Sequence, residues 1–92
     1  MKITYDPGKN QRNIAARGLS FDRACEFDFE TAMTKVDQRY AYGETRFISL
    51  GYLDARLHVL CFVEVVSGIR VISFRKANKR EVDHYARQET ID

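Results

Sequence analysis

The 92-residue sequence has little of several residue types that characterise whole protein classes. It holds two cysteines, two histidines, one proline and no tryptophan. Cys25 and Cys61 lie far apart and form no C-x-x-C motif, so neither a disulfide framework nor a zinc site is predicted. We expect both to be buried, reduced thiols. No apolar run approaches the roughly 20 residues of a membrane span, and the polar N-terminus lacks a secretory signal, which favours a cytoplasmic protein without membrane contact.

Motifs that bind common cofactors are also missing. The sequence contains no H-x-x-x-H, no G-x-x-x-x-G-K-[ST] and no G-x-G-x-x-G, so neither a metal ion nor a nucleotide cofactor is expected. His58 lies between apolar neighbours, which is more typical of a hydrogen-bonded strand histidine than of a general base. His84, on a predicted exposed helix, is no better a catalytic candidate.

Composition indicates one small globular domain, with 45% hydrophobic and 30% charged residues. Fifteen basic and thirteen acidic residues give a net charge of +2, too small by itself to indicate a nucleic-acid partner. The charges are unevenly distributed, because the basic residues between Arg70 and Arg80 have no acid among them, whereas acids gather between Asp22 and Glu30. That acidic stretch is either a solvated helix face or a docking surface for a basic partner.

The N-terminal half predicts one short strand followed by two short helices. Asp6 and Pro7 are typical of a helix start and Gly18 of a helix end, so a helix over about residues 7–17 is expected, with Asp6 as its cap. Ser20 is the candidate cap of the second helix. Residues 28–43 show no clear period, and a loop or irregular strand is expected there.

The C-terminal half predicts strands and a closing helix. Apolar runs at 47–53, 57–66 and 69–74, separated by Asp54-Ala55 and Ser67-Gly68, predict a three-stranded antiparallel meander. The helix expected over residues 79–88 has a thin apolar face, so it is either largely solvated or covered by a partner protein.

Arginine carries the strongest chemical signal. Arg46, Arg70 and Arg75 lie on or beside predicted strands, where guanidinium groups can clamp a phosphate and stabilise developing charge. Glu44 lies on the same face as Arg46 and can orient it or accept a proton. The competing interpretation is that these arginines only form surface ion pairs. Arg70 and Arg75 share a face only if a bulge separates them or Arg75 lies past the strand end, and the second arrangement is favoured.

Four segments, in order along the chain, resemble the BrnT family of toxins. They are Tyr5-Asp6-Pro7 with Lys9 and Asn13-Ile14; Gly18-Leu19-Ser20-Phe21 with Ala24; Gly43-Glu44-Thr45-Arg46-Phe47 with Gly51; and Arg70 to Ala77 with Lys79, Arg80, Glu81 and Tyr85. The resemblance implies a single BrnT-like toxin domain over residues 1–92 with a RelE-like α+β fold. That fold has a short N-terminal strand, two short helices, an antiparallel three- to four-stranded sheet and a C-terminal helix.

The resemblance also implies a ribonuclease toxin of a type II toxin–antitoxin system that cleaves RNA without a metal ion, by attack of the ribose 2′-hydroxyl, and thereby inhibits translation. A BrnA-like antitoxin would neutralise it, DNA would be contacted only through that antitoxin, and a homodimer within the complex is compatible with this family. The implied catalytic residues are Arg46, Arg70, Arg75 and Glu44; the implied RNA-binding residues are Arg17, Lys76, Lys79 and Arg80.

The chain departs from the family pattern at the end of the first helix. Family members usually have a Lys-His pair where this sequence has Ala16 and Arg17, and Tyr5 replaces a common tryptophan. Arginine at position 17 can still hold phosphate. The alternative hypothesis is therefore a non-catalytic module with a degenerate active site that pairs with an antitoxin or binds nucleic acid.

Overall fold

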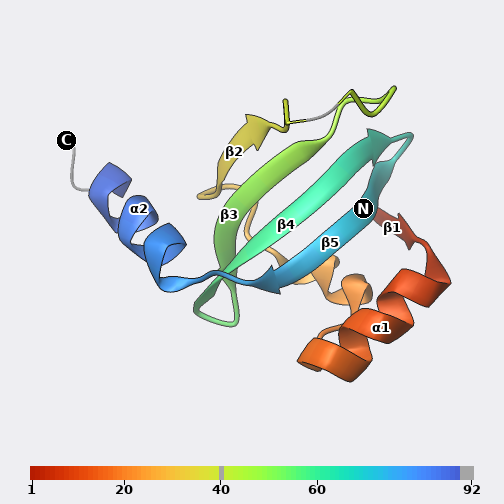
Figure 1. The fold of residues 1–92 in the computed structure, drawn as a ribbon, viewed down its shortest axis with the longest axis horizontal. Coiled ribbons are helices and arrows are strands. Elements are labelled where there is room, and N and C mark those ends of the chain that lie inside the picture. Colours follow the sequence, from red (N-terminus) through yellow and green to blue (C-terminus); the bar gives the residue numbers. More distant parts are fainter. Residues whose placement is uncertain (40, 90–92) are drawn as a thin grey trace.

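The structure, a computed structural model, describes residues 1–39 and 41–89. Its elements are β1 (Lys2–Tyr5), α1 (Pro7–Arg17), the 3₁₀ helix η1 (Phe21–Glu26), β2 (Met33–Val36), β3 (Phe47–Leu53), β4 (Arg56–Val65), β5 (Gly68–Lys76) and α2 (Lys79–Glu89). The strands form one sheet in the order β1-β5-β4-β3-β2, with α1 and α2 on opposite sides of it (Figure 1). Within the described residues, no helix has the length and apolar character needed to cross a membrane.

Both N-terminal helices lie where their start and stop signals predict. α1 ends at Gly18, whose φ of 65° is left-handed and whose N–H donates to the Ile14 carbonyl. The expectation that Asp6 caps α1 is wrong in one respect, because its side chain makes no capping hydrogen bond. The Ser20 hydroxyl does cap η1 by accepting from the Asp22 N–H at 3.1 Å.

The sheet has five strands and is mixed, which corrects the prediction of a purely antiparallel sheet of three or four strands. The predicted meander is confirmed as β3, β4 and β5, and the positive φ angles of Asp54 (52°) and Ala55 (59°) make the tight turn between β3 and β4. β1 adds to the edge of β5 in parallel. It approaches so closely that a side chain at Gly68 would overlap the Lys2 backbone. β2 is a regular edge strand in the segment where a loop or irregular strand was expected.

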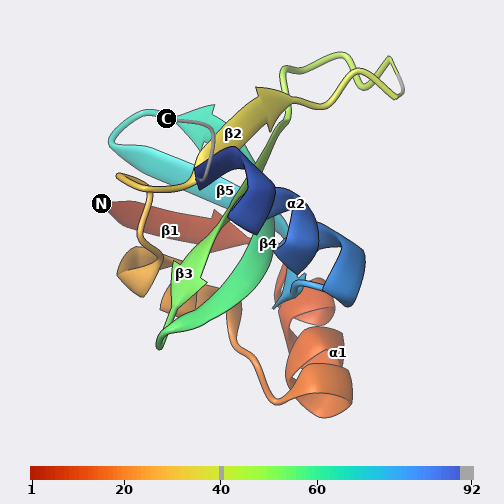
Figure 2. The ribbon, with the colours of Figure 1, turned by 90° about the vertical axis from the view of Figure 1, so that its left-hand side faces the viewer.

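Each face of the sheet has its own apolar cluster. One face, called the closed face, carries residues such as Leu60, Phe62 and Phe74, and η1 with its flanking residues covers it. The other, called the open face, carries Leu50 and Val59, and α2 covers part of it through Tyr85 and Val82. Figure 2 shows α2 lying in front of the strands.

α2 rests on the sheet mainly through one side chain. Tyr85 is only 2% exposed, packs edge-on against Tyr52 at 5.5 Å and donates a hydrogen bond to the Thr31 carbonyl at 2.9 Å. The neighbouring Ala86 is exposed. The predicted thin apolar face is thus confirmed, although it packs on this chain's own sheet.

Of the two cysteines, only Cys61 is buried. Cys25 is exposed, so the expectation that both would be buried is wrong. The reason is local, since η1 buries Phe21 and Ala24 and leaves its next position on the outer side.

Candidate functional site

A bulge in β5 brings two of the predicted catalytic arginines to the same face. Cys61 pairs with Ser73 but Phe62 pairs with Val71, so Ile72 is an extra residue in β5. The bulge changes the alternation of side chains, and Arg70 and Arg75 both point away from the closed face. Because β5 continues to Lys76, the favoured alternative, in which Arg75 lies past the strand end, is wrong.

The two arginines nevertheless occupy different rows of the open face. Arg70 pairs with Val63, and Arg75 pairs with Val59. Four residues of β4 separate these rows, which corresponds to about 13 Å at ~3.3 Å per residue. The face therefore carries two basic centres along the strand direction.

Arg46, Glu44 and Arg70 form the first centre. The Arg46 Nε donates to the Glu44 carboxylate at 3.0 Å, and the Arg70 Nη2 donates to its other oxygen at 2.7 Å. Hydrogen bonds from Arg70 and then Arg46 lower the pKa of Glu44. A carboxylate held ionised in this way is a weak proton acceptor but a good orienting group. Further N–H donors remain on each guanidinium, since the group has five.

A buried carboxylate holds the segment that carries this centre. Asp37, with a side chain only 1% exposed, accepts two hydrogen bonds from the Arg39 guanidinium and one from the Tyr42 hydroxyl. Its backbone N–H donates to the Arg46 carbonyl at 2.8 Å. The Tyr42 ring in turn lies 3.9 Å beneath the Arg46 guanidinium, in cation–π contact. These supports were missed in the sequence because residues 28–43 show no periodic signal.

Arg75 and Glu81 form the second centre. Two parallel hydrogen bonds of 2.9 Å join the guanidinium to the carboxylate at the start of α2. The Arg75 hydrogen bonds lower the pKa of Glu81, and the same pairing raises the pKa of Arg75. Both residues line a groove of about 490 Å³ between the open face and α2, here called the face groove. Its other polar lining residues include Lys35, Arg39, Ser73 and His84.

Two buried groups on the sheet are held in non-reactive surroundings. Burial lowers the pKa of His58, and its Nδ1 lies 2.8 Å from the Arg56 carbonyl. This confirms the prediction of a hydrogen-bonded strand histidine. Burial raises the pKa of the Cys61 thiol, which disfavours its nucleophilic thiolate form. Among residues 1–39 and 41–89, no three His, Cys, Asp or Glu side chains come together as a metal site requires.

Comparison with known families places this arrangement in a functional class. The chain matches, over residues 5–81, the family described as the ribonuclease toxin, BrnT, of type II toxin-antitoxin systems. It belongs to the BrnT family. A comparison with curated proteins found no match. Membership of this family implies an RNA target and an antitoxin partner.

In this BrnT family member, the four residues expected to bind RNA do not form one site. Arg17 and Lys76 line a second groove, at the sheet end where β5 leaves the sheet. Lys79 and Arg80 lie exposed at the start of α2, where Lys79 forms an ion pair with Asp83 at 3.1 Å. Arg75 is the only predicted residue that lines both grooves.

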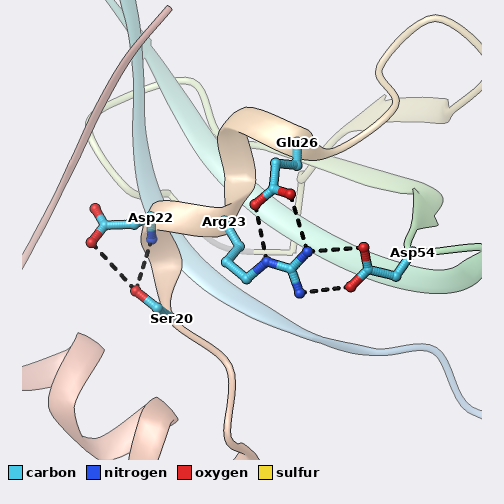
Figure 3. Close-up of polar contacts among 5 residues, drawn as sticks. All are labelled: Ser20, Asp22, Arg23, Glu26 and Asp54. Atoms are coloured by element: carbon cyan, nitrogen blue, oxygen red, sulfur yellow. Dashed lines mark hydrogen bonds and ion pairs between the residues drawn. The ribbon is translucent and has the colours of Figure 1, made fainter.

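The acidic stretch of the BrnT chain contains two local networks. Asp28 accepts hydrogen bonds from the backbone N–H groups of Glu30 and Thr31 and from the Thr31 hydroxyl, which lower its pKa. Arg23 joins Glu26 on η1 to Asp54 in the turn between β3 and β4, at 3.0 and 2.7 Å (Figure 3). Asp28 and Glu26 therefore have structural roles within the chain.

Proposed function

We propose that this BrnT family member is an endoribonuclease that cleaves RNA without a metal ion, on the open face of its sheet. The supporting observation is the alignment of Arg46, Arg70 and Arg75 on one face, beside a groove. Transesterification of RNA needs a positioned phosphate and stabilisation of developing negative charge, and fixed guanidinium groups supply both.

The proposed reaction is an intramolecular transesterification of the RNA chain. The 2′-oxygen forms a bond to the adjacent phosphorus while the bond from phosphorus to the 5′-oxygen breaks. The 2′-hydroxyl gives its proton to a base, and the 5′-oxygen takes up a proton as it leaves. The products are a 2′,3′-cyclic phosphate and a 5′-hydroxyl end.

Each residue of the open face has a distinct proposed role. Arg46 and Arg70 bind a neighbouring phosphate of the RNA strand with the N–H donors that Glu44 leaves available. Glu44 acts as a positioning residue, since one carboxylate fixes both guanidinium groups. Arg75 binds the reacting phosphate within the face groove, next to His84, and exposed cations such as Lys79 and Arg80 attract the RNA backbone.

His84 is the proposed proton acceptor. It lines the face groove, in which Glu81 is already engaged by Arg75 and has a lowered pKa. Histidine is the side chain that most readily exchanges a proton near neutral pH. The imidazole therefore supplies the proton transfer that the carboxylates of this face are poorly suited to perform.

The family supports an antitoxin partner, and we propose a BrnA-like protein that covers the open face, with DNA contacted only through it. In that setting the protein acts in the cytoplasm, where it reaches the RNA of the translation machinery. A homodimer within the complex is compatible with this arrangement.

A second candidate function is a non-catalytic module that pairs with an antitoxin or binds nucleic acid. One observation favours it: all three arginines already have a carboxylate partner within the chain. The two functions predict different effects of the same substitutions, because a binding module has no turnover to lose.

Induction in bacteria separates these functions. Wild type should arrest growth with fragmented RNA within an hour, whereas the Arg70→Ala/Arg75→Ala double variant and His84→Asn should leave growth and RNA intact. The matched control, Arg12→Ala on the exposed side of α1, should behave as wild type. Normal growth with a soluble, folded wild type would refute the enzymatic function, and full arrest by His84→Asn would refute its proton-transfer role.

A further inference from the structure

The second groove, here called the end groove, lies where three segments far apart in the sequence meet. It has a volume of about 640 Å³ and is lined by the end of α1, the turn between β3 and β4, and the last residues of β5. Five of its lining side chains are cationic, and Asp54 is its only acid among the described residues. It is larger than the face groove.

Hydrogen bonds through Asn13 fix the end of α1 against β5. The buried Asn13 amide donates to the carbonyls of Leu19 and Phe74, at 3.0 and 2.9 Å. Its oxygen accepts from the Arg17 Nη1 at 3.2 Å. Asn13 thus joins the last turn of α1, which carries Arg17, to the end of β5. Phe74 immediately precedes Arg75, so Arg17 lies close to the point where β5 leaves the sheet.

The Arg23 network fixes the opposite rim. Its guanidinium bridges Glu26 on η1 and Asp54 in the turn between β3 and β4 (Figure 3). Arg23 shares its single positive charge between two carboxylates, so this network has a net charge of −1, which is smaller than the positive charge of the remaining groove cations. Arg23 therefore shapes the groove, and its charge is already compensated.

Three other cations face the groove without an ion pair among the contacts of the described residues: Arg17, Arg56 and Lys76. All three are exposed. Lys76 pairs in the sheet with His58, and the charges of both Arg56 and Lys76 act on that histidine. Three uncompensated cations around one concave surface favour a polyanion.

We infer that the end groove is a second binding subsite for the phosphate backbone of single-stranded RNA. It adjoins the face groove at Arg75, which lines both. A strand bound on the open face would pass Arg75 and place neighbouring phosphates against Arg17, Arg56 and Lys76. Arg56, which sequence reasoning missed, belongs to this subsite. The inference extends the proposed function, because it names where the rest of the substrate binds.

Binding of a non-cleavable RNA tests this subsite separately from catalysis. The probe is a fluorescent 12-nucleotide RNA with 2′-O-methyl groups, and its affinity is measured by anisotropy from 50 to 200 mM salt. The test variant is Arg17→Gln/Arg56→Gln/Lys76→Gln. The charge-matched control is Lys2→Gln/Lys9→Gln/Arg12→Gln, whose exposed positions lie outside both grooves. Circular dichroism checks that both variants are folded.

The end-groove variant should lose affinity about tenfold or more, and its salt slope should fall by about 2, since each phosphate contact to single strands contributes about 0.7. The control should keep the wild-type slope. A variant slope equal to that of the control, or a wild type that does not bind the probe, would overturn the subsite. If the variant and the control have equal slopes but wild type still cleaves unmodified RNA, the subsite is wrong and the proposed function stands. If the slope of the end-groove variant falls but wild type cleaves no RNA, only the subsite stands.

Discussion

The carboxylate of Asp37 organises the segment that leads into β3. It is nearly fully buried, yet its hydrogen bonds come from an exposed arginine and a tyrosine hydroxyl. The Arg39 guanidinium, followed by the Tyr42 hydroxyl, holds the pKa of Asp37 far below its usual range. Since Tyr42 also lies against Arg46, this one carboxylate indirectly positions the first basic centre.

Replacing Asp37 by asparagine should lower the melting temperature near neutral pH, and the loss should depend on pH. A lowered folded-state pKa stabilises the fold above the unfolded pKa of about 3.9 and loses that contribution as the pH falls toward the folded pKa. The difference from wild type should thus be constant from pH 7 to pH 5 and shrink below about pH 4. Thermal melts at several pH values measure it.

Asp83→Asn is the matched control, because that carboxylate is half-exposed and pairs only with exposed Lys79 in the described contacts. It should change the melting temperature little. A difference between wild type and Asp37→Asn that stays the same from pH 7 to pH 3 would contradict the role assigned to the ionised carboxylate.

Among the elements, those with strong local signals were predictable from sequence. Pro7 and Gly18 bound α1, and the turn at Asp54-Ala55 fixes the hairpin of β3 and β4. β1 was expected as a strand, but its parallel pairing with β5 links residues more than sixty positions apart, such as Lys2 and Gly68, and no local pattern encodes it. The bulge at Ile72 also leaves no clear periodic signal, although it decides on which face Arg75 lies.

The attachment of α2 depends on Tyr85, and this can be measured. Tyr85→Phe keeps the ring but removes the hydrogen bond to the Thr31 carbonyl, and should cost about 1 kcal/mol of unfolding free energy. Tyr85→Ala also empties the space beside Tyr52, and should cost about 3–5 kcal/mol. Denaturant unfolding measures both variants.

Gln88→Ala, an exposed position on the same helix, is the control and should stay within about 0.5 kcal/mol of wild type. A cost for Tyr85→Ala no larger than that of the control would show that α2 does not pack on the sheet in solution. The face groove, which needs α2 as one wall, would then not exist as described.

For the whole molecule, the distribution of charge matters more than its sum. A net charge of +2 conceals an open face with two basic centres and a third cationic surface in the end groove. Sequence reasoning identified Arg46, Arg70, Arg75 and Glu44 as candidates, and Glu44 does pair with Arg46 in the structure. It could not place Arg17 and Lys76 in a separate groove or find Arg56, because their proximity depends on three-dimensional contacts such as those of Asn13.

Cleavage of a short single-stranded RNA by the purified protein, in the presence of a metal chelator, tests the central claim most directly. Wild type and Arg12→Gln should produce fragments ending in 2′,3′-cyclic phosphate. Arg75→Gln should cleave about a hundredfold more slowly, since charge-stabilising donors contribute at about that level. A 2′-deoxy substitution at the scissile nucleotide should stop the reaction in every case. No cleavage by folded wild type, or equal rates for wild type and Arg75→Gln, would contradict the account.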